Sequence, residues 1–321
     1  MKKLIVLEPV NLFGLNLPNK RFHDNYIVRP DLKWSNETSS FPGMEYSFPF
    51  EKFFLPIGKE TQQFANDYWH YCFYISAIYL VTIFSLQYWM RSRESYNLRT
   101  PLFYWNILLS IFSILGTFRC APEFFDIILN EGIAASFTKS SYYKDYRLTL
   151  WYLWFTVSKA FELIDTLFIV LRKTKLIPLH WVHHLLTLTF SWFVFPDVPA
   201  TARWMVNMNF FVHSLMYTYY ALKAVKIQIP KQVNITITIL QVTQMFLGLY
   251  IHYQSLKLKL LGQPVDASYS VLFVGSLLYS IFAILFVQFF IRTYILTSRP
   301  MRILKEFSQL RRKNATDKKC H

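Results

Sequence analysis

Long runs of apolar residues, separated by short polar stretches, dominate the chain from residue 68 onward. Seven such segments stand out, at about residues 68–90, 101–118, 148–171, 177–195, 203–222, 233–254 and 269–296. Each has roughly the 17 to 25 residues with which a helix crosses a ~30 Å hydrocarbon layer, or slightly more. The pattern predicts an all-α multi-pass membrane protein with seven transmembrane helices.

The regions on either side of these segments differ in character, so the chain divides into three parts. Residues 1–67 contain no long apolar run and balance eight basic against eight acidic residues, residues 68–296 carry the apolar segments, and residues 297–321 form a basic tail. Within the central part, residues 119–147 mix Phe and Ile with polar residues. This mixture predicts an amphipathic helix at the membrane interface.

Composition and the placement of charge agree with a membrane protein. Hydrophobic types make up 53% of the chain and charged types 17%, below the ~25% charged residues of average soluble domains. The net charge is +15, but the basic residues flank the apolar segments instead of forming one stripe, so no nucleic-acid partner is expected. One set of alternate loops, with the C-terminal region counted from Arg292, holds eighteen Lys and Arg, against seven on the other set. The positive-inside rule then predicts a cytosolic C-terminus and a lumenal N-terminus.

Two short motifs point to the endoplasmic reticulum membrane. Asn36 begins an Asn-Glu-Thr glycosylation acceptor on the predicted lumenal tail. The ending Lys318-Lys319-Cys320-His321 resembles the dilysine retrieval signal of proteins in that membrane. Because Cys120 has no visible lumenal partner among the three cysteines, no disulfide bond is expected.

Ionisable residues inside an apolar segment are costly unless they are paired, so their presence needs a reason. In the third segment Lys159, Glu162, Asp165 and Thr166 fall within an arc of ~120° on a continuous helix. Lys159 and Glu162 are spaced to form an ion pair on that face. Asp165 is then free to orient another group.

Histidines and other polar residues repeat this pattern in the next three segments. His180, His183 and His184 cover an arc of ~100° at the start of the fourth segment. The fifth and sixth segments add further polar residues at helical spacing, which either line a site or join helices inside the membrane: Asn209, His213, Met216, Tyr217, Tyr220, Thr238, Gln241 and Gln244. In the predicted topology all four polar faces lie in the cytosolic half of the membrane. They predict a polar cavity open to the cytosol, with apolar walls suited to a long acyl chain.

Three classes of function use such a cluster. Membrane di-iron desaturases also contain a His-x-x-His-His sequence, and four histidines could hold one zinc ion, but only four of the eight here can meet, too few for two irons. A seven-span receptor would place its polar groups toward the outside, whereas these lie toward the cytosol. A transporter is expected to show related halves, and this sequence shows no internal repeat. The third use is nucleophilic and general-base chemistry, because imidazole titrates near neutrality and can be acylated by a thioester.

Four motifs follow one another along the chain: Lys159-x-x-Glu162-x-x-Asp165-Thr166, His180-x-x-His183-His184, Asn209-x3-His213-x-x-Met216-Tyr217-x-Tyr219-Tyr220 and Thr238-x-x-Gln241-x-x-Gln244. In this order they resemble the motifs of the very-long-chain fatty acid elongases (the ELO family), over roughly residues 50–300. The resemblance implies a 3-ketoacyl-CoA synthase of the endoplasmic reticulum that condenses a long acyl-CoA with malonyl-CoA and needs no metal or other cofactor. It also implies that six of the seven helices form a barrel around an acyl tunnel closed at the lumenal end. Trp181, which follows the first histidine of the second motif, is similar to the residue found there in the family branch that acts on saturated and monounsaturated acyl chains.

The resemblance and the chemistry of imidazole lead to a ping-pong hypothesis. His183 attacks the thioester to form an acyl-imidazole, with His180 and Asp165 fixing its tautomer. Malonyl-CoA then loses CO₂, its carbanion takes the acyl group, and His184, His213 and Asn209 stabilise the oxyanion.

The other candidate residues are expected to contact the substrates. Some shape the polar tunnel, and basic ones bind the phosphates of CoA at its mouth, although the positive-inside rule explains the basic ones equally well. They are Lys159, Glu162, Thr166, Tyr217, Tyr220, Gln241, Gln244, Arg172, Lys173 and Lys223. Expected partners are acyl-CoA, malonyl-CoA, membrane lipid and the other enzymes of the elongation cycle.

Overall fold

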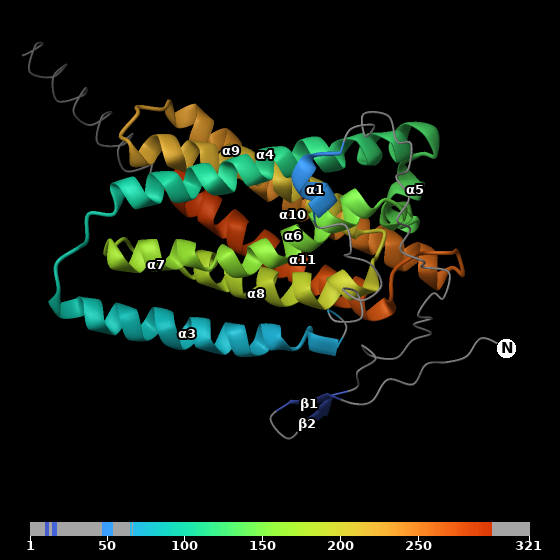
Figure 1. Ribbon diagram of the computed structural model, residues 1–321, viewed down its shortest axis with the longest axis horizontal. Coiled ribbons are helices and arrows are strands. Elements are labelled where there is room, and N and C mark those ends of the chain that lie inside the picture. Colours follow the sequence, from blue (N-terminus) through green and yellow to red (C-terminus); the bar gives the residue numbers. More distant parts are fainter. Residues whose placement is uncertain (1–9, 13–14, 18–46, 54–64, 66, 297–321) are drawn as a thin grey trace, which may run out of the picture.

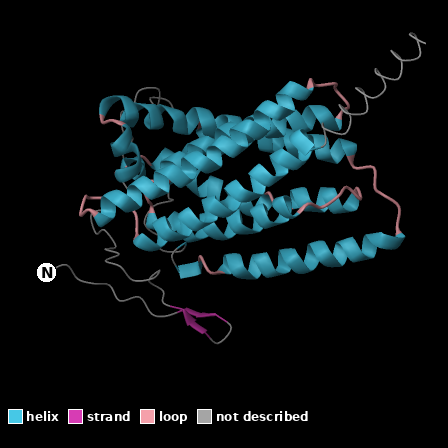
Figure 2. Cartoon of the chain, turned by 180° about the vertical axis from the view of Figure 1, so that it is seen from behind, coloured by secondary structure: helices cyan, strands magenta, loops and turns pink. Residues whose placement is uncertain are grey.

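The computed structural model describes residues 10–12, 15–17, 47–53, 65 and 67–296, and most of these residues lie in helices that run side by side (Figure 1). β1 (Val10–Leu12) and β2 (Leu15–Leu17) pair as a short antiparallel hairpin. Apart from this hairpin, the regular structure of the described residues is helical (Figure 2), which confirms the predicted helical fold class.

The helices follow the apolar segments closely. In chain order they are α1 (Pro49–Phe53), α3 (Tyr71–Trp89), α4 (Arg99–Asn130), α5 (Ile133–Thr138), α6 (Tyr146–Phe161), α7 (Ile164–Leu171), α8 (Pro178–Val194), α9 (Ala202–Ala224), α10 (Lys231–Leu260) and α11 (Tyr269–Phe290). Short 3₁₀ turns lie at Met90–Ser92, Ser141–Lys144 and Phe195–Asp197, and a π-helical turn at Ile291–Leu296 ends the described chain.

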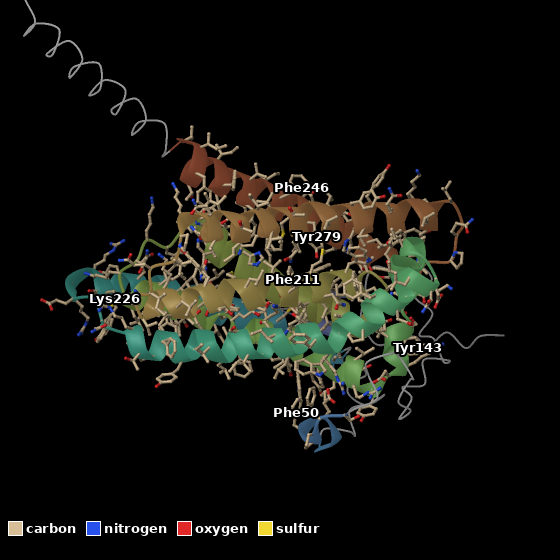
Figure 3. All side chains as sticks on the ribbon, turned by 90° about the horizontal axis from the view of Figure 1, so that it is seen from above. Phe50, Tyr143, Phe211, Lys226, Phe246 and Tyr279 are labelled. Atoms are coloured by element: carbon tan, nitrogen blue, oxygen red, sulfur yellow. The ribbon has the colours of Figure 1, made fainter. Side chains whose placement is uncertain are left out.

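Among the described residues, four helices are long and apolar enough to cross a membrane, so the chain is a multi-pass membrane protein. They are Tyr71–Ser92, Arg99–Asn130, Lys231–Leu260 and Tyr269–Leu296. The other three predicted segments correspond to α6 with α7, to α8 and to α9. α6, α7 and α8 have 16, 8 and 17 residues, and α9 carries polar residues such as Arg203 and Asn207 that lower its hydropathy. Large apolar side chains such as Phe211 and Phe246 are exposed on the outside of the bundle, as a lipid-facing surface requires (Figure 3).

Contacts between helices close a circle. They run from α4 to α9, α10, α11, α8 and α6, and from α6 back to α4. α3 lies outside this circle, packed against α7 and α8, at the lower edge of Figure 1. One cluster of buried apolar residues joins α3, α8 and α11, and a second joins α4, α6 and α9.

The basic loops gather at one end of the bundle, which we call the basic end. There the backbone N–H of Tyr96 donates to the carbonyl of Leu171 at 3.1 Å, and Lys173 Nζ donates to the carbonyl of Arg91 at 3.3 Å. Lys226 lies at the same end (Figure 3). The loops after α3, α7 and α9 therefore share one side, as the alternation of loops predicts.

The remaining loops meet at the opposite end, which we call the closed end. The Ala200 N–H donates to the carbonyl of Asp266 at 2.7 Å, and the Asp266 N–H donates to the carbonyl of Thr138 at 2.8 Å. Tyr143 lies here, at the far side of the bundle from Lys226 (Figure 3). Burial raises the pKa of the neighbouring Tyr142 hydroxyl well above its usual value, so it stays protonated and donates to Pro199 O at 3.0 Å.

Among the described residues, three buried ion pairs lie at the closed end; two of them join different helices, and the third joins residues two positions apart. Each joins an arginine to a carboxylate with N···O distances of 2.5–2.6 Å, and every side chain is at most 6% exposed. Such charges are tolerated away from water because each is paired and hydrogen-bonded. The pairs are Arg119–Glu51, Arg147–Asp145 and Arg203–Glu123.

One expectation about this region needs correction, and one contact was not predicted. Residues 119–130 are not part of a separate interfacial helix, because they continue α4 as far as Asn130, and only the short α5 follows. Part of the predicted N-terminal tail also packs on the bundle: Glu51 of α1 accepts hydrogen bonds from Arg119 and from Trp151 Nε1. A buried arginine in an apolar segment needs a carboxylate partner, and that partner lies 68 residues earlier in the chain.

Several sequence features fall outside the described residues. They are the glycosylation acceptor at Asn36, the dilysine ending at Lys318 and Lys319, and the basic tail after residue 296. Cys72 and Cys120 are described, and both are buried thiols that form no disulfide bond there.

Candidate active site

The third polar segment consists of two helices, so the prediction of one continuous helix over 148–171 was wrong in this respect. α6 ends at Phe161 and α7 begins at Ile164. Between them the backbone uses bonds to the third preceding residue, from Asp165 N to Glu162 O at 3.1 Å and from Thr166 N to Leu163 O at 3.2 Å. This is 3₁₀ geometry, which turns the side chains that follow through a different angle than an α-helix would.

Lys159 lies at the centre of a buried network between α6 and α9. Its Nζ donates to Glu162 Oε1 at 2.7 Å, which confirms the predicted ion pair, and to Asn209 Oδ1 at 2.9 Å. Asn209 Nδ2 lies 3.0 Å from His213 Nε2. Because the lysine can only donate, the amide oxygen of Asn209 must face it and the amide NH₂ must face the imidazole. His213 therefore accepts at Nε2 and carries its proton on Nδ1, 3.7 Å from Glu162 Oε1.

Asp165 does not hold an imidazole as expected. Its Oδ1 accepts from Trp105 Nε1 at 2.6 Å, and its Oδ2 accepts from the Tyr217 hydroxyl at 2.9 Å. Within the described residues neither Asp165 nor His180 makes a hydrogen bond to His183. Asp165 instead fixes the position of Tyr217. The hydrogen bonds by which Asp165 and His180 were expected to set the tautomer of His183 are therefore not the ones observed among these residues.

Trp105 and Tyr79 were missed by sequence reasoning. Both lie in apolar helices, where aromatic residues read as lipid-facing or core residues. Their polar atoms are the only available signal, since an indole N–H or a phenol O–H in a membrane-spanning segment needs an acceptor. The acceptors lie 60 and 87 positions away in sequence, for Trp105 and Tyr79 respectively.

The three histidines of α8 lie together. The ring centroids of His180 and His184 are 4.4 Å apart, and those of His183 and His184 are 5.8 Å apart. The ring of His183 also packs on Phe282, with centroids 4.5 Å apart. The Nδ1 atoms of His183 and His184 are buried without a hydrogen-bond partner, which leaves their Nε2 atoms to meet a substrate.

A cavity of about 150 Å³ brings the four predicted polar faces together. It is lined by residues of α7, α8, α9, α10 and α11. Ten of its lining residues were candidates from the sequence: Asp165, His180, His183, His184, Asn209, His213, Tyr217, Tyr220, Gln241 and Gln244. Lys159 and Thr166 lie behind this wall and bond to Asn209 and His180, which form it, and Glu162 accepts from Lys159.

A second cavity of about 340 Å³ adjoins the first toward the basic end. The two cavities share Asp165, His180, Tyr217 and Tyr220. Arg172 and Lys223 line the second cavity. Lys173, the third predicted phosphate ligand, points instead to the Arg91 carbonyl.

Two small, mainly apolar cavities continue the series toward the closed end. The first, about 40 Å³, is bounded by His183, Asn209 and Gln244 on the side of the site. The next, about 30 Å³, reaches Tyr142 and Pro199. Their walls are mostly aromatic and aliphatic, with Phe155, Phe190, Met205, Leu278, Tyr279, Phe282, Val194 and Phe195. The four cavities thus pass from exposed basic residues, through the histidines, to a narrow apolar end.

This arrangement suits nucleophilic chemistry on a long apolar molecule with an anionic head. Within the described ranges, no three His, Cys, Asp or Glu side chains are grouped as a metal site requires. The imidazoles lie where the polar and apolar parts of the cavity series meet.

Comparison with known proteins agrees with the motifs. The model of the ELO family, described as the GNS1/SUR4 family, matches residues 64–302. The chain is 38% identical over 262 residues to very long chain fatty acid elongase 6 of Drosophila melanogaster, covering 81% of this chain and 82% of the relative. It is 37% identical over 251 residues to the mouse protein of the same name, covering 77% and 92%, and 36% identical over 260 residues to human very long chain fatty acid elongase 3, covering 81% and 95%.

Proposed function

Because this chain belongs to the ELO (GNS1/SUR4) family of fatty acid elongases, we propose that it condenses a long-chain acyl-CoA with malonyl-CoA. The reaction makes a 3-ketoacyl-CoA two carbons longer and releases CO₂ and CoA. One observation carries the proposal: the series of cavities has basic residues at one end, an apolar wall at the other and imidazoles between them.

The substrate lies along this series with its CoA toward the basic end. Arg172 and Lys223 are exposed cations at the wider cavity, and they bind CoA phosphates there. The acyl chain extends past His183 toward Phe190 and Phe282, where burial of each methylene contributes ~0.8 kcal/mol. The thioester then lies beside the histidines.

His183 is the nucleophile in the first half-reaction. Its Nε2 lone pair attacks the thioester carbon, the C–S bond breaks, and CoA leaves as a thiolate that takes up a proton. The product is an acyl-imidazole. Splitting a difficult transfer into two steps in this way is the general advantage of covalent catalysis.

Malonyl-CoA is the second substrate. Loss of CO₂ leaves an enolate carbon that attacks the acyl carbon; the C–N bond breaks, and the departing imidazole takes up one proton from the cytosolic solvent, which replaces the proton it gave to CoA and restores His183. His184, His213 and Asn209 lie around the same cavity and stabilise the negative oxygen that develops. Asp165 acts through Tyr217, and Glu162 and Lys159 through Asn209 and His213. No metal or other cofactor takes part.

The membrane arrangement follows from the same proposal. All seven apolar segments span the endoplasmic reticulum membrane, with the circle of six helices forming a barrel around the acyl tunnel and α3 packed outside it. The basic end faces the cytosol, where acyl-CoA and malonyl-CoA are present, and the C-terminus lies on that side. The acyl chain of the substrate is saturated or monounsaturated. This preference is supported by the resemblance at Trp181, whose ring packs edge-on against Phe84 of α3. Partners are membrane lipid and the enzymes that reduce and dehydrate the 3-ketoacyl product.

The covalent step is tested with acyl-CoA alone. Purified protein is expected to release about one equivalent of free CoA per site and to gain the mass of the acyl group on a peptide containing His183. His183→Ala removes both signals. Adding labelled malonyl-CoA then discharges the acyl group into a 3-ketoacyl-CoA. Protein that elongates acyl-CoA without ever showing a histidine-linked acyl group contradicts the covalent step. Protein that elongates no acyl-CoA in a panel of lengths and unsaturation contradicts the function.

A further inference from the structure

α3 contributes one hydroxyl group to the site although it lies outside the circle of six helices. The Tyr79 hydroxyl lies 2.8 Å from Thr166 Oγ1, and Thr166 Oγ1 lies 3.1 Å from His180 Nε2. These side chains form a continuous line from α3 through α7 to α8. The 3₁₀ junction before α7 is what turns Thr166 toward α3 and α8.

Because Tyr79 and Thr166 are buried, the donor and acceptor of each hydrogen bond in this line can be assigned. Tyr79 is 5% exposed, and Thr166 is its one hydrogen-bond partner in the described part of the chain. A buried O–H that fails to donate costs about 1–3 kcal/mol, so Tyr79 donates to Thr166. Thr166 has a single hydroxyl proton, which it then donates to His180. An Nε2 that accepts a hydrogen bond leaves the imidazole proton on Nδ1.

His180 lies where a thioester has to pass, with its Nε2 bonded to Thr166 and its Nδ1 left for other partners. His180 lines both the 150 Å³ cavity and the 340 Å³ cavity, and so stands at their junction. Its Nδ1 is not among the buried atoms that lack a partner, in contrast to the Nδ1 atoms of His183 and His184. Its proton is therefore available to a substrate.

We propose that Tyr79 is a positioning residue of the condensing reaction: through Thr166 it holds His180 as the Nδ1–H tautomer, whose proton is donated to the carbonyl oxygen of the bound thioester. This inference rests on the proposed function. Without the tyrosine hydroxyl, Thr166 loses the donor that polarises and orients its own O–H toward Nε2 of His180, so the Nδ1–H tautomer is less strongly favoured. The ring then also adopts the other tautomer, which presents a lone pair to the substrate oxygen and repels it.

The test is Tyr79→Phe, which removes the hydroxyl and keeps the ring. We expect the rate of CoA release from acyl-CoA alone, and kcat for elongation, to fall on the order of tenfold per folded enzyme, less than the 10²–10³ lost with a direct oxyanion donor. The KM for acyl-CoA is expected to stay within about twofold, because the CoA contacts lie elsewhere. Tyr146→Phe is the matched control, since Tyr146 is also buried and its hydroxyl is bonded to a hydroxyl, 3.2 Å from Ser47 Oγ at the closed end.

A double-mutant cycle separates positioning from packing. In the background of Thr166→Ser, which keeps a hydroxyl at position 166, Tyr79→Phe is expected to lower kcat as it does in the wild type. In the background of Thr166→Val, which breaks the line, the same change is expected to have no further effect. Losses that multiply in the valine background, or a Tyr79→Phe enzyme whose kcat per folded molecule is within twofold of wild type, overturn the proposal.

The wild-type assay distinguishes this inference from the function on which it depends. Wild-type protein that elongates acyl-CoA establishes the function, and the variants then decide the role of Tyr79 alone. Wild-type protein that elongates none overturns both. A fall in thermal stability for Tyr79→Phe with unchanged kcat assigns the hydroxyl to the fold and overturns positioning.

Discussion

Lys159 of α6 donates a hydrogen bond to the side-chain oxygen of Asn209 on α9, at 2.9 Å and across 50 positions of sequence. Lys159 does not line the 150 Å³ cavity, but this contact determines which way the side-chain amide of Asn209 faces. The amide in turn decides which nitrogen of His213 carries a proton. A charge buried in an apolar helix thereby sets the state of an imidazole in the site.

Lys159→Met is expected to destabilise the protein by about 3–5 kcal/mol, because it leaves Glu162 buried without its cation. Glu162 is 4% exposed, so water cannot replace the lysine. The double variant Lys159→Met, Glu162→Gln removes both charges and should recover most of the thermal stability in detergent, but not the elongation activity. A single variant as stable as wild type would mean that Glu162 has another partner.

Asn209→Ala is expected to lower kcat by about 10–100-fold, because His213 loses its oriented donor. Its effect on the free energy of unfolding should be only ~1–2 kcal/mol. Asn207→Ala is the matched control on the same helix: both asparagines are 8% exposed, but Asn207 donates to the Arg203 carbonyl of its own helix. Steady-state elongation rates per folded enzyme separate the two, and equal losses would argue against a role for Asn209 in the reaction.

Glu51→Ala is expected to destabilise the closed end by about 3–5 kcal/mol, because Arg119 and Trp151 lose a buried acceptor. Unfolding in detergent, followed by loss of the monodisperse peak on heating, measures the effect. The exposed pair Lys139–Glu131, whose side chains are 61% and 44% exposed, provides the contrast. Glu131→Ala should change stability by no more than ~1 kcal/mol.

Gly275→Ala is expected to cost about 1–3 kcal/mol through overpacking. A Cβ at position 275 would overlap the imidazole of His252, which is fully buried and bonded through Nδ1 to the Gly248 carbonyl at 2.9 Å. Combining it with His252→Ala should return part of the lost melting temperature. If the double variant is less stable than either single one, steric overlap is not the cause.

Lys223→Glu is expected to raise the KM for acyl-CoA about tenfold with little change in kcat, because it reverses a charge beside the CoA phosphates. The effect should shrink as salt is added. Lys226→Glu is the control, since Lys226 is exposed at the same basic end but does not line the wider cavity. Equal effects of the two variants would indicate a general surface potential in place of a defined phosphate site.

The positions of the helices and most of the cavity wall were predictable from the sequence. Helical periodicity placed His180, His183 and His184 on one face, and the alternation of loops placed that face level with His213 and Gln244, which share the cavity. Helical periodicity gives the face of each helix on which a residue lies, and the alternation of loops gives its depth in the membrane. Together they are enough to place the polar faces of different helices at the same depth.

The partners of individual side chains were not predictable. The assignment of Asp165 to an imidazole assumed a continuous helix, and the 3₁₀ junction at Glu162 turned the carboxylate toward Trp105 and Tyr217. No Gly or Pro marks this junction, so tertiary contacts decide it. Likewise, the residues around Glu51 do not indicate that it pairs with Arg119, because the ion pair forms only when α1 packs against α4 and α6.

The buried ion pairs at one end of the bundle give the molecule an uneven stiffness. Arg119 and Arg203 join separate helices at the closed end through buried charges that are costly to separate, while the basic end is joined by exposed loops. Thermal breathing is therefore concentrated where the bulky nucleotide head arrives, and the opposite end acts as a fixed floor. If the acyl chain binds as proposed, with its end toward the closed end, the lengthened product leaves through the basic end by which the shorter substrate entered.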